Sequence, residues 1–232
     1  MRLHRFYVQK PLGEEILKVE NVNIIHQLVS VFRYKESNEV IFFSDDGYDY
    51  TYSISSLSKK EISFVLKDKK KGIILNKDIT LYMSLVKKDT FENIVRYCTE
   101  LGVTRFVPII AERSEKKNLN EERLKIIATE ATEQCGRNNI PVISPIISLE
   151  EALKVAENVV VASLFGNDIK NKETQKSLEN KEISIFVGPE GGWTDREEKI
   201  FEENNLTKIK LTNTVLKADT AATSVSTIAI LL

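Results

Sequence analysis

The chain has 232 residues, of which 42% are apolar, and its formal net charge is −1. That length suffices for one or two domains with a real core, and the near-neutral charge gives the molecule no general bias toward nucleic acid. The two cysteines match no metal or disulfide framework. Since the chain also shows no signal peptide and no apolar run of about 18 residues, we expect a cytoplasmic protein without metal or membrane partner.

Residues 1–72 are expected to form a small β-domain. Short apolar runs recur with turn-like clusters between them, and one helix is predicted near residues 22–33. The predicted strands are Leu17 to Val19, Val40 to Phe43, Tyr50 to Ile54, and Ile62 to Leu66. Such spacing is typical of a small barrel or sandwich. The lysine-rich run Lys67 to Gly72 is interpreted as a solvated domain boundary.

From residue 73 onward, strands and helices alternate, which predicts an α/β domain with a mostly parallel sheet covered by helices on both faces. The predicted strands are 79–86, 105–110, 142–147, 159–165, 183–187 and 209–211. The predicted helices cover 89–102 and 120–136, and others begin after the capping residues Ser148 and Thr194 and near Asp219. Gly102 is the expected C-cap of the first of these helices.

Three of these strands end in unusual loops, at residues 162–167, 188–192 and 211–222. Because ligands of open α/β sheets bind beyond the carboxyl ends of the strands, we expect the three loops to form one pocket. Glycines allow main-chain groups to approach a ligand closely, and Leu164, Leu211 and Leu216 would supply apolar walls. The middle loop, GPEGG, has neither the spacing of a dinucleotide-binding loop nor the lysine of a phosphate-binding loop.

The stretch GPEGGWTDREE at 188–198, with TEQCGRNNIP before it and VLKADTAATS after it, resembles the bacterial 16S rRNA uridine-N3 methyltransferase family, the RsmE family. The resemblance extends over nearly the whole chain and includes the opening MRLHRFY, TELGV at 99–103 and ERS at 112–114. The family belongs to the SPOUT methyltransferases, which bind S-adenosylmethionine in a deep trefoil knot and act as homodimers. Four positions depart from the residues usual in the family: Tyr97, Thr212, Lys217 and Asp219.

The resemblance implies a PUA-like β-barrel for RNA recognition over residues 1–72. It also implies a knotted SPOUT methyltransferase domain for cofactor binding and dimerisation over residues 73–232. The implied activity is S-adenosylmethionine-dependent methylation of N3 of a uridine in 16S rRNA, free or in the small ribosomal subunit. Two alternatives stay open: a SPOUT enzyme that methylates a ribose 2′-hydroxyl, and a non-catalytic RNA-binding factor of ribosome assembly.

The resemblance also implies the residues of the site, most of which lie in the three loops. The catalytic candidates are Glu190, Lys217, Asp219 and Arg137; either carboxylate would accept the N3 proton, and Lys217 would stabilise charge on the uracil oxygens. As alternatives, Asp219 caps the last helix and Glu190 binds the cofactor's amino group. The implied cofactor-binding residues are Leu164, Phe165, Gly166, Gly188, Pro189, Glu190, Gly191, Gly192, Leu211, Asn213, Leu216, Thr220 and Ala221.

RNA contacts are expected from two parts of the chain, the opening strand and two arginines of the middle region. Arg2, Arg5 and Tyr7 lie on an opening strand, where they would present cations and a ring for base stacking. A solvated edge strand is the alternative for this segment. Arg113 and Arg137 are expected to hold RNA phosphates, although an arginine near a helix C-terminus such as Arg137 also stabilises the helix dipole.

Overall fold

The computed structural model describes residues 3–73, 75–115 and 118–232, which form two compact units. The first unit contains the residues up to 74 together with Thr132–Asn139. The second unit contains Leu75–Ala131 and Ile140–Leu232. The sequence assigned Thr132–Asn139 to the second of two domains, so the observed units differ from the expected ones by this segment.

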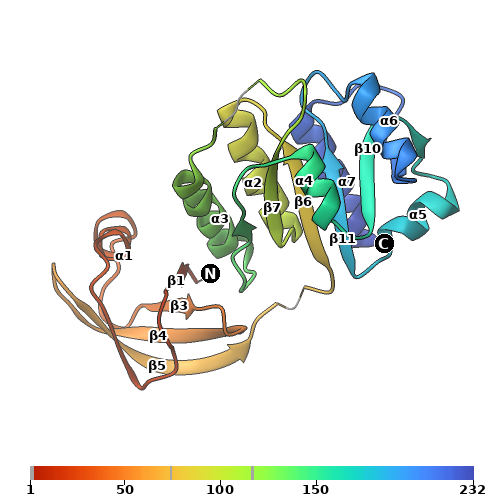
Figure 1. The fold of residues 1–232 in the computed structure, drawn as a ribbon. Helices are drawn as coiled ribbons and strands as arrows, with labels where there is room; N and C mark the ends of the chain where they lie inside the picture. Colours follow the sequence, from red (N-terminus) through yellow and green to blue (C-terminus); the bar gives the residue numbers. More distant parts are fainter. Residues whose placement is uncertain (1–2, 74, 116–117) are drawn as a thin grey trace. The chain divides into compact units, whose positions relative to one another are not determined.

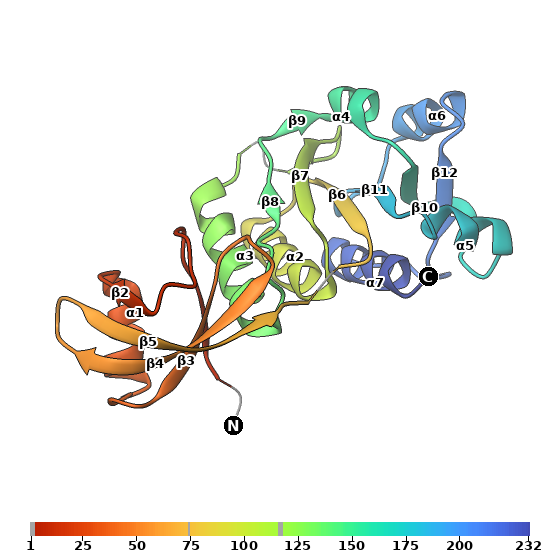
Figure 2. The same cartoon turned by 90° about the horizontal axis from the view of Figure 1, so that it is seen from below.

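The first unit is built on a five-stranded sheet with the strand order β1-β3-β4-β5-β2 (Figures 1 and 2). β1 pairs in parallel with β3, and the other neighbouring strands pair antiparallel. The expected helix is present as α1 (Val22–His26), which continues into a π-helical turn, η1 (Gln27–Val31). The expected strands are confirmed; their bounds are β1 (Arg5–Tyr7), β2 (Ile16–Val19), β3 (Glu39–Phe43), β4 (Tyr48–Leu57) and β5 (Ile62–Lys71).

The lysine-rich end of β5 is exposed, as expected, and the first segment of the first unit ends at residue 74, shortly after it, but the run is also part of the sheet. Tyr48–Thr51 of β4 pair with this end of β5. The ammonium of Lys69 lies 4.0 Å from the ring centre of Tyr48 and 5.1 Å from that of Tyr50. Main-chain pairing and these cation–π contacts extend the strand through a run that reads as loop by charge alone.

The second unit contains a parallel sheet with the strand order β12-β10-β11-β6-β7-β8, with β9 also beside β7 (Figure 2). The neighbouring strands of this sheet run parallel to one another, which confirms the expected parallel sheet. The strands are β6 (Asp78–Ser84), β7 (Arg105–Ile110), β8 (Val142–Ile143), β9 (Ile147–Ser148), β10 (Val159–Asp168), β11 (Glu182–Val187) and β12 (Thr207–Lys210).

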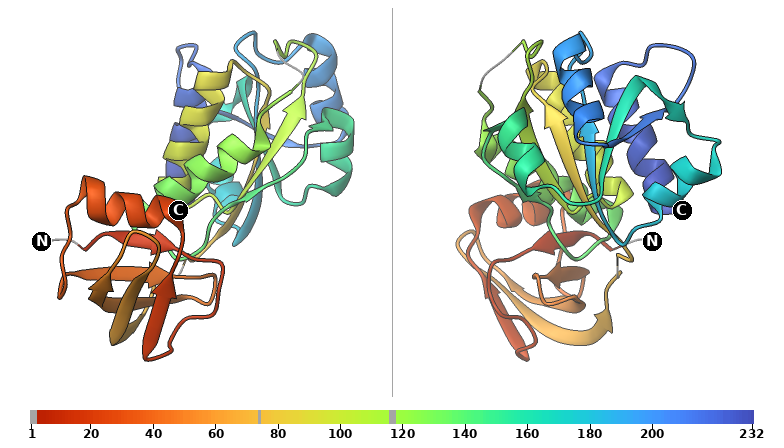
Figure 3. Two further views of the ribbon diagram at one scale, coloured as in Figure 1. Left: turned by 90° about the vertical axis from the view of Figure 1, so that its left-hand side faces the viewer. Right: turned by 45° about the vertical axis from the view of Figure 1, so that its right-hand side comes forward.

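Helices cover both faces of this sheet, as expected. Figure 2 shows α2 and α7 on one side of the strands and α4 and α6 on the other, and in Figure 3 α2 and α7 lie side by side. Each face has its own core, with Phe91 and Val225 on one side and Phe186 and Phe201 on the other. The helices are α2 (Lys88–Leu101), α3 (Glu121–Cys135), α4 (Leu149–Val155), α5 (Lys172–Leu178), α6 (Asp195–Glu203) and α7 (Ala218–Leu231).

The helix ends follow local sequence chemistry. Ser148 and Thr194 each begin a helix with a complete capping box, as their positions predict. Gly102 ends α2 with a φ of 108°, which confirms it as a left-handed C-cap. Only α5 was not predicted, because its sequence, KETQKSL, is almost entirely polar and shows no apolar period. In the described ranges no helix is both long and apolar enough to cross a membrane.

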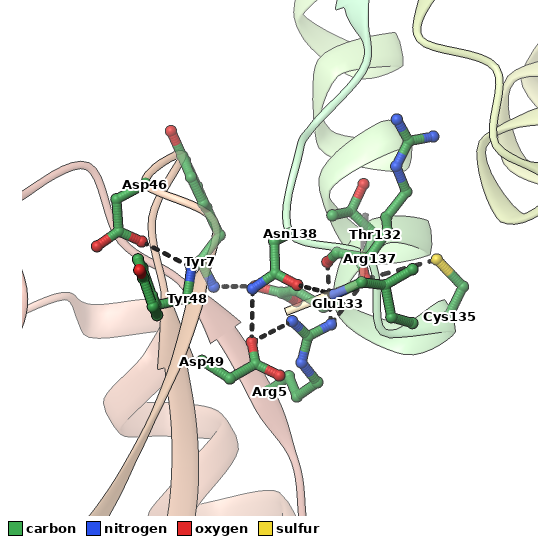
Figure 4. Close-up of polar contacts among 11 residues, drawn as sticks. Arg5, Tyr7, Asp46, Tyr48, Asp49, Thr132, Glu133, Cys135, Arg137 and Asn138 are labelled. Carbon is green, nitrogen blue, oxygen red and sulfur yellow. Dashed lines mark hydrogen bonds and ion pairs between the residues drawn. The ribbon is translucent and has the colours of Figure 1, made fainter. Parts of the chain in front are cut away.

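The segment Thr132–Asn139 joins the first unit through a buried polar cluster centred on Arg5 (Figure 4). Arg5 donates from Nη1 to the main-chain oxygens of Thr132 and Arg137, and from Nη2 to the Asp49 carboxylate at 2.6 Å. Asn138 donates to the same carboxylate oxygen at 2.7 Å. The cluster therefore places a cation beside the C-terminal end of α3, which the helix dipole favours.

This cluster corrects the role expected for Arg5. The residue is 7% exposed and its guanidinium lies 4.4 Å from the Phe43 ring centre, so it does not present its charge to RNA. Its neighbour Tyr7 donates from its hydroxyl to Asp45, and burial together with that carboxylate raises the pKa of Tyr7 to about 12. Arg2, which was expected beside them, lies outside the described residues.

Cys98 provides a test of the packing of α2. The residue is fully buried, and burial raises the pKa of its thiol to about 12. Because the thiol is buried and its ionisation is suppressed, the native protein should leave Cys98 unmodified by a thiol reagent such as DTNB. Peptide mapping after labelling should find Cys98 modified only once denaturant is added. Rapid native labelling of Cys98 would contradict the packing described.

Candidate ligand-binding pocket

A cavity of about 310 Å³ lies at the ends of β11 and β12 and beside an interruption in β10. Its volume is in the range of small-molecule sites. All three loops that the sequence singled out contribute to its walls. The predicted cofactor-binding residues that line it are Leu164, Phe165, Gly188, Pro189, Glu190, Gly191, Gly192, Leu211, Leu216 and Ala221, whereas Gly166, Asn213 and Thr220 are not among its lining residues.

The first wall is a wide bulge in β10, which we call the β10 bulge (residues 163–166). Ala162 and Asn167 both pair with Ile209 of β12, so the four residues between them leave the ladder. As a result Leu164 is 50% exposed and Phe165 is 75% exposed, and both face the cavity. At Gly166 an added Cβ would lie 2.5 Å from the main-chain nitrogen of Ile209, so this glycine allows the close return of the bulge to β12.

The second wall is the glycine-rich loop at 188–192, which is closed by hydrogen bonds. Arg113 donates from Nη1 to the main-chain oxygens of Gly191 at 2.8 Å and Trp193 at 3.1 Å. Gly192 donates from its main-chain nitrogen to Pro189 and has a φ of 68°, a value that favours glycine. Arg113, expected to contact RNA, thus lines the cavity and holds this loop.

Trp193 ties this loop to the foot of the β10 bulge. Its indole Nε1 donates to the main-chain oxygen of Ala162 at 2.9 Å, and its ring packs edge-on against Phe201. At Gly188 an added Cβ would lie 3.1 Å from the Trp193 ring. The absence of a side chain at Gly188 therefore lets the indole close over the loop.

A buried polar chain, which the sequence analysis did not identify, lies beside the same bulge. Ser163 donates from Oγ to Glu198 Oε1 at 2.6 Å, and Lys208 donates to Glu198 Oε2 at 3.1 Å. Glu198 is 9% exposed and lines the cavity with Ser163. Two features of the sequence could have indicated these hydrogen-bonded side chains. One is a serine inside the apolar run 159–165, and the other is a glutamate three residues before Phe201 on the buried face of α6.

The three catalytic candidates of the second unit lie in different surroundings. Glu190 lines the cavity and is exposed, with a long hydrogen bond of 3.5 Å from the main-chain nitrogen of Lys87. Lys217 and Asp219 are not lining residues. The N-cap of α7 is Lys217, so the alternative role of Asp219 as the cap is wrong; its carboxylate accepts from the main-chain nitrogen of Thr220 in the first turn.

Arg137, the fourth catalytic candidate, belongs to the first unit. It is 3% exposed, and burial lowers the pKa of its guanidinium. Its main-chain oxygen accepts from Arg5, as described above. Like Arg5, it is too buried to present its guanidinium to RNA phosphates, which corrects that expectation. Among the residues that the structure describes, no group of three or more His, Cys, Asp or Glu side chains is placed to hold a metal ion.

Residues 74–230, which contain this parallel sheet and its cavity, match a family model of an RNA methyltransferase domain. The chain is 33% identical to ribosomal RNA small subunit methyltransferase E of Aquifex aeolicus over 97% of this chain and 98% of that protein. It is 29% identical to the Rickettsia conorii protein of the same name over 96% of this chain and 93% of the relative. The chain belongs to the ribosomal RNA small subunit methyltransferase E family.

Solved structures agree with this assignment. A ribosomal RNA small subunit methyltransferase E from Neisseria gonorrhoeae, bound to S-adenosyl methionine, matches with a TM-score of 0.85 and 26% identity over 97% of this chain and 95% of that one. A putative methyltransferase from Legionella pneumophila, in complex with SAM, has the same fold, with a TM-score of 0.87 and 22% identity over 99% of this chain and 97% of that one.

Proposed function

We propose that this protein uses S-adenosylmethionine to methylate N3 of a uridine in the 16S rRNA of the small ribosomal subunit. The observation that carries the proposal is the cavity formed by the β10 bulge, the glycine-rich loop and the loop after β12. Membership of the ribosomal RNA small subunit methyltransferase E family supports the reaction class. The related Neisseria gonorrhoeae structure, bound to S-adenosyl methionine, supports the cofactor.

The residues present fit such a cofactor. Leu164, Leu211 and Leu216 supply apolar surface for an adenosine group, and the peptide groups of the glycine-rich loop offer donors and acceptors. When bound, S-adenosylmethionine supplies a methyl group activated by the positive sulfonium.

The chain's own residues would prepare the acceptor base. Uracil N3 must lose its proton, and Glu190 is the candidate that lies in the cavity wall to receive it on a carboxylate oxygen. The negative charge then spreads onto the uracil oxygens, where Arg113, a lining residue of the cavity, would stabilise it. Apolar walls at Leu164 and Phe165 would exclude water and hold the base in line for attack.

Four further features belong to this proposal. The five-stranded first unit is the PUA-like RNA-recognition domain, with Tyr7 as an RNA contact, and Arg113 of the second unit is a further RNA contact. The loops at the cavity form the deep trefoil knot, and the active form is a homodimer in the cytoplasm.

The exposed apolar side chains of Phe165 and Val215, near the cavity, are consistent with a surface that the second subunit of the dimer covers. Sedimentation at micromolar concentration should give twice the chain mass; a monomer at all concentrations would contradict the dimer.

The function is tested by methyl transfer in vitro. Purified protein, labelled S-adenosylmethionine and small subunits from a strain lacking the gene should yield 3-methyluridine in 16S rRNA, identified by mass spectrometry of nucleosides. Label found on a ribose 2′-hydroxyl would favour the first alternative of the sequence analysis. Binding of RNA without any transfer would favour the assembly factor.

Glu190→Gln is expected to lower kcat about 100-fold, because the amide cannot accept the N3 proton. Its dissociation constant for S-adenosylmethionine should change less than about threefold. Asp219→Asn is the matched control, since Asp219 is not a lining residue of the cavity. A large rise in the dissociation constant with unchanged kcat would instead assign Glu190 to the cofactor's amino group.

A further inference from the structure

The first residue of the β10 bulge is hydrogen-bonded to the carboxylate of Glu198, which belongs to helix α6. Ser163 is the first residue of the bulge, and its hydroxyl makes two bonds of opposite sense. It accepts from the main-chain nitrogen of Phe165 at 3.1 Å and donates to Glu198 Oε1 at 2.6 Å. One hydroxyl thus joins the main chain of the bulge to helix α6.

Glu198 is otherwise fully engaged. Its second oxygen accepts from the ammonium of Lys208, whose side chain is 13% exposed, at 3.1 Å. Lys208 also donates to Glu202 at 2.7 Å, and the side chain of Glu202 is 65% exposed. A buried carboxylate is costly unless it is paired and hydrogen-bonded, and here both oxygens have partners within the protein. Glu198 therefore faces the cavity wall with its bonds directed to the bulge and to β12.

The polarity of these bonds constrains the bulge. Because the carboxylate accepts only, the Ser163 hydrogen is directed to Glu198 and the lone pair is left to accept from Phe165. The four bulge residues have no ladder bonds of their own to hold them, since Ala162 and Asn167 share one partner on β12. Without the Ser163 bonds, Leu164 and Phe165 would sample several conformations before a ligand arrives.

We propose that Glu198 and Ser163 are positioning residues of the S-adenosylmethionine site. They hold the β10 bulge in one conformation, so that Leu164 and Phe165 already have their ligand-binding positions in the ligand-free protein. Binding then loses less conformational entropy than it would with a mobile bulge, and affinity rises. This inference rests on the proposed function of the cavity and adds residues that act through the bulge rather than on the ligand.

The test is isothermal titration of S-adenosylmethionine into the full chain and four variants. Ser163→Ala and Glu198→Ala should each weaken binding about tenfold, in the range of a charge-assisted hydrogen bond. The double variant should bind S-adenosylmethionine no more weakly than the single variant with the lower affinity, because both changes break the same Ser163–Glu198 hydrogen bond. Ser163→Thr keeps the hydroxyl and should restore most of the affinity. Melting of the ligand-free proteins reports any separate loss of stability.

Glu202→Gln is the matched control. It removes the other carboxylate that pairs with Lys208, and Glu202 is not a lining residue of the cavity, so affinity should stay within about twofold of wild type. If Glu198→Ala does not fold, Ser163→Ala, which removes a single oxygen, still decides the question.

Three results would overturn the inference. Wild-type affinity in Ser163→Ala would show that the hydroxyl does not position the wall. Weak binding in Glu198→Ala alone, or losses that multiply in the double variant, would mean that Glu198 contacts the ligand independently. A wild-type protein that binds no S-adenosylmethionine would overturn the proposed function itself, which distinguishes the two failures.

Discussion

Asp49→Ala is expected to lower the free energy of unfolding of the first unit by about 3 kcal/mol, because it leaves the buried Arg5 guanidinium without its carboxylate. The side chains of Arg5 and Asp49 are 4% and 23% exposed, and their atoms lie 2.6 Å apart. Asn138 loses its acceptor in the same variant, so the hold on Thr132–Asn139 weakens as well. Urea denaturation, followed through the tyrosine-rich first unit, measures the loss.

Glu61→Ala is the control for this prediction. Glu61 pairs with Lys18 at 3.0 Å in the same sheet, but Lys18 is 63% exposed, so solvent screens the pair. Exposed pairs contribute little, and the midpoint of unfolding should hardly move. Equal effects of the two variants would show that burial of the Arg5–Asp49 pair has no special weight.

Gly166→Ala is expected to destabilise the second unit by about 2 kcal/mol, since the added methyl overlaps main-chain atoms that no side-chain rotation can move away. The added Cβ would lie 2.5 Å from the nitrogen of Ile209 and 2.6 Å from its carbonyl carbon. The β10 bulge must shift to relieve this overlap. Affinity for S-adenosylmethionine should therefore fall at least about tenfold, measured by titration alongside thermal unfolding.

Gly191→Ala is the comparison for Gly166→Ala. There the nearest atom to the added Cβ is the Arg113 Cδ at 3.2 Å, which belongs to a flexible side chain that can move by a few tenths of an ångström. The free energy of unfolding should stay close to that of wild type. If Gly191→Ala destabilises the protein as much as Gly166→Ala, the close approach of the bulge to β12 is not the cause.

Local rules allowed much of the second unit to be predicted. The apolar runs became parallel strands, since buried strands read as continuous apolar stretches. Ser148, Thr194 and Gly102 end or begin helices by bonds that depend on neighbouring residues alone. The three loops met at one cavity because the carboxyl ends of parallel strands lie along one edge of a sheet.

The expectations that failed depended on residues distant in the chain. An arginine on an opening strand reads as exposed, but Asp49 and two carbonyls at the end of α3 bury Arg5. No strand was expected at Lys67 to Lys71, but pairing with β4 extends β5 through them. The residues next to Arg5 in the sequence could not predict its pairing with Asp49, because Asp49 is 44 positions away and meets Arg5 only in the folded protein.

By itself, the sequence determined most of the strands and helices and which loops carry the glycines, because caps, turns and apolar periods act over a few residues. Only the tertiary structure decided that β10 leaves its ladder for four residues and that Ser163 meets Glu198 35 positions further on. A bulge and a buried carboxylate are stabilised by pairing between elements, and that pairing exists only once the sheet has formed.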